Sequence, residues 1–138
     1  MAYKTDGGKL RQYTRFVDTV TSPATKDLQY WKESLDILEE QGIQPQRLMT
    51  AAVGMCAESG EFADICKKLS WHGKEFDEET RTHLLKEIGD VCWYLSQAII
   101  ALDTTWEEVL DMNIAKLSDR YPGGFDALRS ASRKEGDI

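Results

Sequence analysis

Apolar residues recur along most of the chain at the i, i+3, i+4 spacing of an amphipathic helix. No stretch shows the strict alternation of apolar and polar residues that marks a half-buried strand. The prolines at positions 23, 45 and 122 fall where a helix should begin or end. The sequence therefore predicts an all-α bundle of about five helices, over about 10–20, 25–40, 45–70, 78–102 and 104–121.

Local signals set several of these boundaries. Asp77 is the predicted N-cap of the helix over 78–102, and Thr104 with Glu107 forms a predicted capping box for the last helix. Pro122 and the two glycines after it end that helix. We expect residues 1–129 to form one domain and residues 130–138 to be a polar, flexible tail.

The second half of the helix over 78–102 is apolar on nearly every side. A helix of this kind must be buried on more than one side, and in a chain of 138 residues a partner subunit is the expected cover. The sequence therefore predicts a core completed by oligomerisation. The clear polar interruptions between positions 88 and 102 are Gly89, Asp90, Ser96 and Gln97.

Charge and composition exclude several classes of function. With 17 Lys and Arg against 24 Asp and Glu, the net charge of -7 disfavours non-specific binding to nucleic acid. No apolar run approaches the roughly 20 residues of a membrane span, and the first ten residues lack the apolar core of a signal peptide. Cys56, Cys66 and Cys92 have neither zinc nor disulfide spacing, so we expect buried free thiols and a cytoplasmic protein.

Two of the predicted helices each carry a pair of acids at i and i+3, on one helix face: Glu58 with Glu61, and Glu87 with Asp90. Other such pairs occur in the chain, but these two have apolar neighbours one turn away, which places the acids toward the packed side. An ionised carboxylate there costs several kcal/mol unless it is paired or bound to a cation. A glycine precedes the second acid of each pair. These glycines predict a close approach of the two helix backbones, which would bring the four acids together.

Four carboxylates in one pocket repel one another. At about 4 Å and an effective dielectric constant near 20, one like-charged pair costs about 4 kcal/mol. Ligands that are all oxygen favour Mg²⁺ or Mn²⁺ over zinc, so the pattern predicts a divalent metal site. The alternative is that Lys67, Lys68 or Lys86 neutralises the acids in salt bridges, and the spacing leaves that alternative open.

The last predicted helix carries Asn113, Lys116 and Arg120 at i, i+3 and i+7, on one face. Lysine and arginine bind phosphate oxygens well. Cations near a helix C-terminus also favour the macrodipole, but that explanation leaves the asparagine unexplained. An acidic metal site beside this cationic stripe is the combination that a nucleoside triphosphate requires.

Three strings of this sequence, GMCAESGEFADICKK, KEIGDVCWYL and NIAKLSDRYPGGF, resemble the MazG-like nucleoside triphosphate pyrophosphohydrolases. That family belongs to an all-α superfamily that also holds dimeric dUTPases. The resemblance covers roughly residues 48–125, and the pairing of ExxE with ExxD and then NxxKLxxRYP is far more specific than any one piece. The segments LMTAAVG and AESGEF, in a compact single-domain chain, are similar to the short members of the family carried by bacteriophages, including phages of cyanobacteria.

The resemblance implies hydrolysis of a nucleoside triphosphate to the monophosphate and pyrophosphate, with two or more Mg²⁺ ions per site and Mn²⁺ as a substitute. It implies a homodimer or homotetramer, in the host cytoplasm if the protein is phage-encoded. Carried over by position, it gives the metal-binding and catalytic acids as Glu58, Glu61, Glu87 and Asp90, and the phosphate or sugar contacts as Asn113, Lys116, Arg120 and Tyr121. Trp71 and Trp31 are candidates for stacking on the base, with core packing an equal alternative for each.

Two rival interpretations remain. A ferritin-like di-iron protein needs ExxH motifs, and here His83 follows Glu79 by four positions instead of three. An inert helical dimerisation module needs an apolar interface and gains nothing from acids on that side. The sequence leaves open the base, the sugar, the acid that acts as general base and the phosphorus that is attacked.

Overall fold

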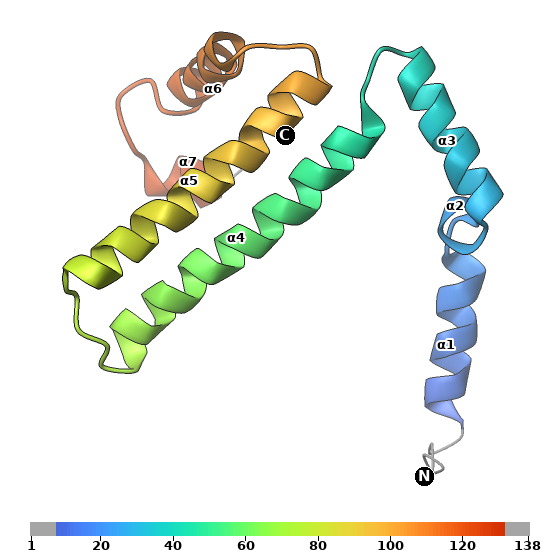
Figure 1. Cartoon of the computed structure of the whole chain (residues 1–138), viewed down its shortest axis with the longest axis horizontal. Coiled ribbons are helices and arrows are strands. Elements are labelled where there is room, and N and C mark those ends of the chain that lie inside the picture. The colour runs from blue at the N-terminus through green and yellow to red at the C-terminus, as the bar shows by residue number, and fades with distance from the viewer. Residues whose placement is uncertain (1–7, 132–138) are drawn as a thin grey trace. The chain divides into compact units, whose positions relative to one another are not determined.

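The computed structural model describes residues 8–131, and within them every regular element is a helix. The predicted all-α fold is confirmed; an isolated bridge between Pro122 and Gly124 is the one β-type pairing among these residues. The helices are α1 (Lys9–Val20), α2 (Pro23–Lys26), α3 (Leu28–Glu40), α4 (Pro45–Trp71), α5 (Glu78–Ala101), α6 (Trp106–Arg120) and α7 (Ala127–Ala131), as Figure 1 shows.

The chain divides into two compact units, Met1–Ile43 and Gln44–Ile138. The first unit holds α1, α2 and α3. The helix predicted over 25–40 is interrupted at Asp27, which is extended (φ -125°, ψ 122°) and caps α3. Its carboxylate accepts hydrogen bonds from the backbone N–H groups of Gln29 and Tyr30, at 2.8 and 3.1 Å. The short helix α2 before it was not predicted.

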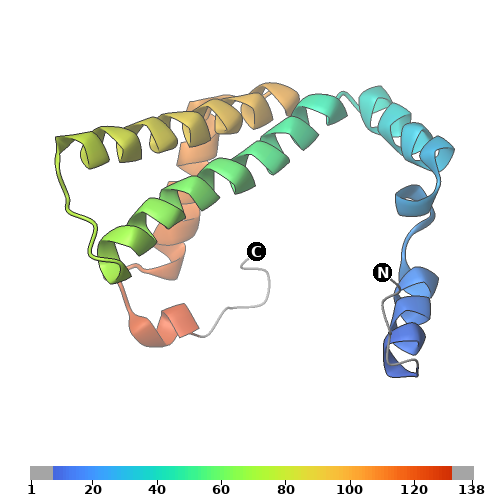
Figure 2. The same cartoon turned by 60° about the horizontal axis from the view of Figure 1, so that its bottom comes forward.

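In the second unit, α4 and α5 form an antiparallel hairpin (Figures 1 and 2). The start of α4 is tied to the end of α5, because the backbone N–H of Gln44 donates to the carbonyl of Ala101 at 3.1 Å. The Arg47 guanidinium also donates to the amide oxygen of Gln97 at 2.5 Å. At the other end of the pair, Asp77 caps α5 as predicted and accepts from the Thr80 N–H at 2.7 Å.

The close approach between α4 and α5 lies at Gly54, and the prediction for Gly60 and Gly89 was wrong. A Cβ added at Gly54 would lie 2.0 Å from a ring carbon of Tyr94, whereas one added at Gly60 or Gly89 would meet nothing within 4 Å. The hydrogen side chain of Gly54 is therefore what lets the tyrosine ring of α5 lie against the α4 backbone. The acids come together without backbone contact at their own glycines.

After α5, the chain turns into α6 at Thr105, one residue later than predicted. The Thr105 hydroxyl accepts a hydrogen bond from the Glu108 N–H at 3.1 Å, so the capping threonine is Thr105 and not Thr104. The helix ends before Tyr121, as predicted. Two residues of the predicted tail, 130 and 131, are the last residues of α7. The rest of the predicted tail, 132–138, lies outside the described residues.

The core of the single chain is small. Among residues 8–131, the buried hydrophobic residues are Ala51, Ile65 and Ala101. The apolar half of α5 is only partly covered, since Ile88, Trp93 and Ile100 are each about half exposed. The three cysteines are free, but Cys56 and Cys92 are exposed and Cys66 is only half-buried, so the prediction of buried thiols was wrong for the single chain. No described helix combines the length and apolar composition needed to cross a membrane.

Candidate metal centre

Three carboxylates from the two helices of the hairpin converge. Glu58 and Glu61 project from α4, and Glu87 projects from α5. One oxygen of each lies within 4.8 Å of an oxygen of the others. The i, i+3 spacing aligns the first two along α4, and the antiparallel pairing of the helices brings the third across to them.

The three acids differ in burial. Glu87 is 5% exposed, Glu58 is half-buried and Glu61 is exposed. Asp90, the fourth predicted ligand, is exposed and lies outside the group of three, although its charge acts on Glu58. The cluster therefore has a buried end at Glu87 on α5 and an open end at Glu61, toward solvent.

The crowding of negative charge affects the Glu58 carboxyl group in particular. Partial burial, followed by repulsion from Glu61, Asp90 and Glu87, raises the pKa of the Glu58 carboxyl above its ordinary value of 4.5. A hydrogen bond with Glu87 acts in the same direction, because a proton shared between two carboxyl groups relieves their repulsion. A divalent cation at this position would relieve the same repulsion.

Within residues 8–131, no lysine forms an ion pair with the three acids. Lys67 and Lys68 both bind Asp64 instead, the latter at 2.6 Å, and these pairs lower the pKa of Asp64 to about 2. Among the described residues Lys86 forms no ion pair with the three acids, so the salt-bridge alternative left open by the spacing is not the arrangement found.

The sequence analysis missed one partner of the cluster, His83. Its Nε2 lies 2.9 Å from Oε1 of Glu87. The two residues are at i and i+4 on α5, so a helical projection of the sequence places them on one face. That spacing was the signal in the sequence that could have identified the contact.

The donor set suits a hard cation. Three carboxylates offer only oxygen atoms, which are the preferred ligands of Mg²⁺ and Mn²⁺. Mg²⁺ commonly keeps several waters and takes one or two carboxylates together with substrate phosphates, so an open side is compatible with it. The arrangement fits a divalent ion shared between protein and phosphate. The individual ligand roles remain predictions.

The predicted phosphate-binding residues lie on α6 and at its C-cap. Asn113 and Lys116 are exposed, and within the described part of the chain neither forms an ion pair or hydrogen bond with the three acids. Arg120 donates to the carbonyl of Ser130 at 3.3 Å, and its guanidinium lies 5.4 Å from the centre of the Tyr121 ring. These contacts fix the end of α6 beside the Pro122–Phe125 turn, where a small pocket of about 180 Å³ opens.

The two tryptophans proposed for base stacking are accessible. Trp71 ends α4 and is 78% exposed, and Trp31 lies on α3 in the other unit and is 44% exposed. Neither is a core residue in the single chain. Their role toward a base stays a prediction.

Comparison with known proteins identifies the chain. Residues 46–125 match the model of the MazG nucleotide pyrophosphohydrolase domain. The Gene 37 protein of Mycobacterium phage L5 is 34% identical over 79 residues, which cover 56% of this chain and 68% of that protein. No solved structure matches the chain. The matched segment spans α4, α5, α6 and the turn after them, which carry all four acids and the cationic stripe. Because this segment is more than half of the chain, the protein belongs to the MazG nucleotide pyrophosphohydrolase family.

Proposed function

We propose that the protein hydrolyses a nucleoside or deoxynucleoside triphosphate to the monophosphate and pyrophosphate, with Mg²⁺ held by the acids of α4 and α5. The observation that supports this most is the convergence of Glu58, Glu61 and Glu87 within 4.8 Å, with no lysine bound to them in the described residues. The family supports the class of reaction, and the all-oxygen ligands support the choice of Mg²⁺ as the ion.

The chain's own residues have separable tasks in this proposal. Glu58, Glu61 and Glu87 hold two or more ions, and Asp90 completes the set at its exposed edge. When bound, Mg²⁺ would offset phosphate charge and make a nearby water more acidic. One of the acids accepts the proton from the attacking water, with Glu61 our candidate because it is exposed at the open end.

The α6 residues act on the substrate instead of the ion. Asn113, Lys116, Arg120 and Tyr121 contact the phosphates or the sugar in this proposal. The lysine and arginine would reduce the repulsion between a polyphosphate and a protein of net charge -7. Arg120 is prepared for this by its contacts with Ser130 and Tyr121, because a fixed guanidinium loses less freedom on binding.

We further propose that the protein is a homodimer or homotetramer. A second copy would cover Ile88, Trp93 and Ile100 on α5, whose half-exposed side chains are more than a monomer of this size normally leaves in water. Size-exclusion chromatography with light scattering measures the molar mass of the protein in solution and tests this directly. A monomer at micromolar concentration would contradict it.

The decisive experiment is an assay of pyrophosphate release. The purified protein is incubated with each natural deoxynucleoside and nucleoside triphosphate, with Mg²⁺, with Mn²⁺ and with chelator. We expect stoichiometric monophosphate and pyrophosphate from at least one substrate, and none with chelator. Release of inorganic phosphate and a diphosphate would contradict the reaction. No turnover of any triphosphate, together with no metal binding, would favour the inert helical module.

A further inference from the structure

His83 lies beside the acid cluster but belongs to none of the three strings that mark the family. It stands on α5 one turn before Glu87, and its Nε2 lies 2.9 Å from the Oε1 of that residue. The imidazole is 55% exposed while the Glu87 side chain is 7% exposed. The histidine therefore contacts the buried end of the cluster from the solvent side.

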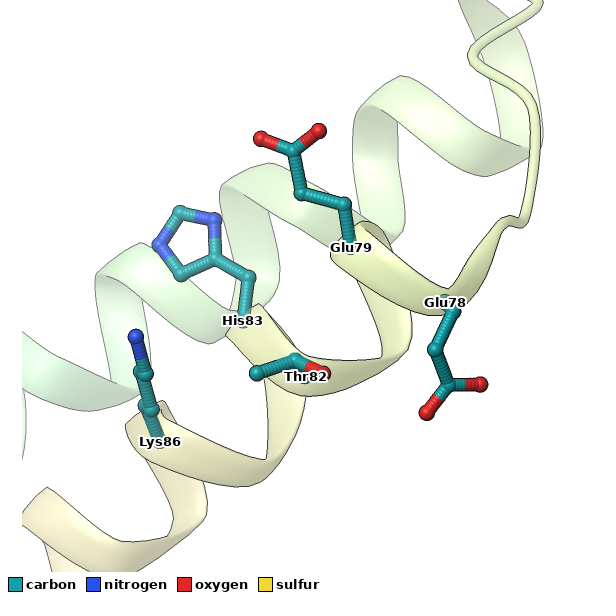
Figure 3. Close-up of a pocket in the computed structure, with 5 residues that line it drawn as sticks. All are labelled: Glu78, Glu79, Thr82, His83 and Lys86. Carbon is teal, nitrogen blue, oxygen red and sulfur yellow. The ribbon is translucent and has the colours of Figure 1, made fainter.

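The surroundings of the histidine form a pocket of about 520 Å³ along the first half of α5. Figure 3 shows Glu79, His83 and Lys86 projecting from one side of the helix, with Glu78 on the other. The imidazole thus lines this open pocket and also contacts one carboxylate of the cluster. Water reaches the ring, whereas the Glu87 carboxylate is shielded from it.

The contact with His83 further restricts the orientation of the Glu87 carboxylate. A glutamate has several rotatable bonds, and holding its carboxylate in one orientation costs entropy at the moment a ligand binds. At 2.9 Å, an Nε2–H donated to Oε1 of Glu87 would hold that oxygen in place, and the second oxygen would then serve the cluster. A neutral imidazole does this without cancelling the negative charge that attracts a cation. A lysine at the same place would cancel it.

We propose that His83 is a positioning residue of the metal centre, which holds the Glu87 carboxylate in the orientation that binds the divalent ion. The inference rests on the proposed function, since it assigns Glu87 to the metal. Hydrogen-bonded partners of metal ligands typically change metal affinity 10–100-fold when they are removed. An i, i+4 pair that only supports the helix would leave metal affinity unchanged while altering stability slightly.

The experiment titrates Mn²⁺ into the full-length protein by calorimetry, without nucleotide. We expect His83→Ala to weaken Mn²⁺ binding about 10-fold or more. His83→Gln should restore most of the affinity, because its amide N–H can donate to the same oxygen. The matched control is His72→Ala, which changes the chain's other histidine, the C-cap of α4, and should leave Mn²⁺ affinity unchanged. Circular dichroism checks that each variant keeps its helices.

A second measurement uses the unaltered protein, so that it does not depend on folding of the variants. The ¹⁵N–¹H correlation spectrum of the imidazoles should show a proton on Nε2 of His83. A bare Nε2, with the proton on Nδ1 alone, would overturn the inference.

The outcomes separate this inference from the proposed function. Equal Mn²⁺ affinity in the unaltered protein and in His83→Ala would overturn the positioning role and leave the metal centre standing. An equal loss in His83→Ala and His83→Gln would overturn the donated hydrogen bond as its cause. Absence of Mn²⁺ binding in the unaltered protein would refute the metal centre itself, and the inference with it.

Discussion

Glu58 and Asp64 stand on the same helix, α4, and differ in the charges that surround them. Asp64 lies between Lys67 and Lys68, and its pKa is lowered to about 2. Glu58 faces Glu61, Glu87 and Asp90, and its pKa is raised above 4.5. Both carboxylates are half-buried, so exposure does not explain the contrast. Lysines of the same helix neutralise Asp64, whereas other acids surround Glu58, as a metal ligand in the proposed function requires.

This contrast separates a structural acid from a candidate ligand more sharply than sequence spacing does. An acid with lysines at i+3 and i+4 gains little from a metal ion. Acids that converge from two helices without a cation repel one another, and the fold retains that repulsion at some cost in stability. Retained repulsion at one place is a recognised mark of a functional site.

The largest expected effect is on turnover. Glu61→Gln removes a ligand charge and our candidate base, and should lower kcat at least about 100-fold, the factor for about 2.7 kcal/mol of lost transition-state stabilisation. The matched control, Asp64→Asn, removes an acid from the same helix and should keep near-normal kcat and KM. Pyrophosphate release under saturating substrate measures both. Equal activity of Glu61→Gln and the unaltered protein would remove that residue from the site.

The next effect is on stability with metal. Mg²⁺ at about 100 times its dissociation constant should add about 2.7 kcal/mol to the free energy of unfolding, provided that the unfolded chain does not bind it. Glu87→Gln should abolish most of this gain, and Asp64→Asn should keep it. Thermal or urea unfolding with and without Mg²⁺ gives the difference. A gain of the same size in both variants would place the ion elsewhere.

The pH dependence of metal binding should follow Glu58. Because its pKa is raised above 4.5, a proton competes with the metal at a higher pH than at an ordinary glutamate. Mn²⁺ affinity should be full well above that pKa and fall as the pH decreases through it. Calorimetric titrations over a pH series measure this, with Glu58→Gln as the variant that loses this part of the dependence. A midpoint below 4.5 would contradict the raised pKa.

The smallest effect is on the acid stability of the metal-free protein. The pKa of Asp64 is about 2 in the fold against an ordinary 3.8, so its ion pairs stabilise the fold fully above 3.8. This contribution is lost as the pH falls through about 2. Asp64→Asn should therefore be slightly less stable than the unaltered protein at neutral pH, and the difference should shrink below pH 3.8 and disappear only below the folded pKa of about 2. Added salt should shrink the difference, because the pairs are partly exposed. A difference that stays as large at pH 2 as at neutral pH would contradict the assignment.

Sequence reasoning succeeded where the governing interaction is local. Pro45 at the start of α4 and Asp77 before α5 act through the backbone within one turn, and both boundaries agree with the structure. It failed by one residue at Thr105, because Thr104 and Thr105 each have a glutamate three positions later and the sequence contains two equivalent capping boxes. It also missed the break at Asp27, whose cap competes with an otherwise continuous helical pattern.

The site was predicted only in part, for a different reason. Spacing placed each acidic pair on one helix face, and the family strings added their chemistry. How far one helix is displaced along the other depends on long-range packing such as that of Tyr94 against Gly54, which no local pattern encodes. In the structure, Glu87 lies in the cluster and Asp90 lies outside the group of three.

The sequence by itself determined the long helices, the cap at Asp77 and the set of acids and cations available for chemistry, because these depend on neighbours within a turn. The tertiary structure alone decided which carboxylates meet, that Lys67 and Lys68 bind Asp64 rather than the cluster, and that His83 rather than a lysine contacts Glu87. Those outcomes depend on how two helices are set side by side, and on which of several nearby partners each rotatable side chain reaches.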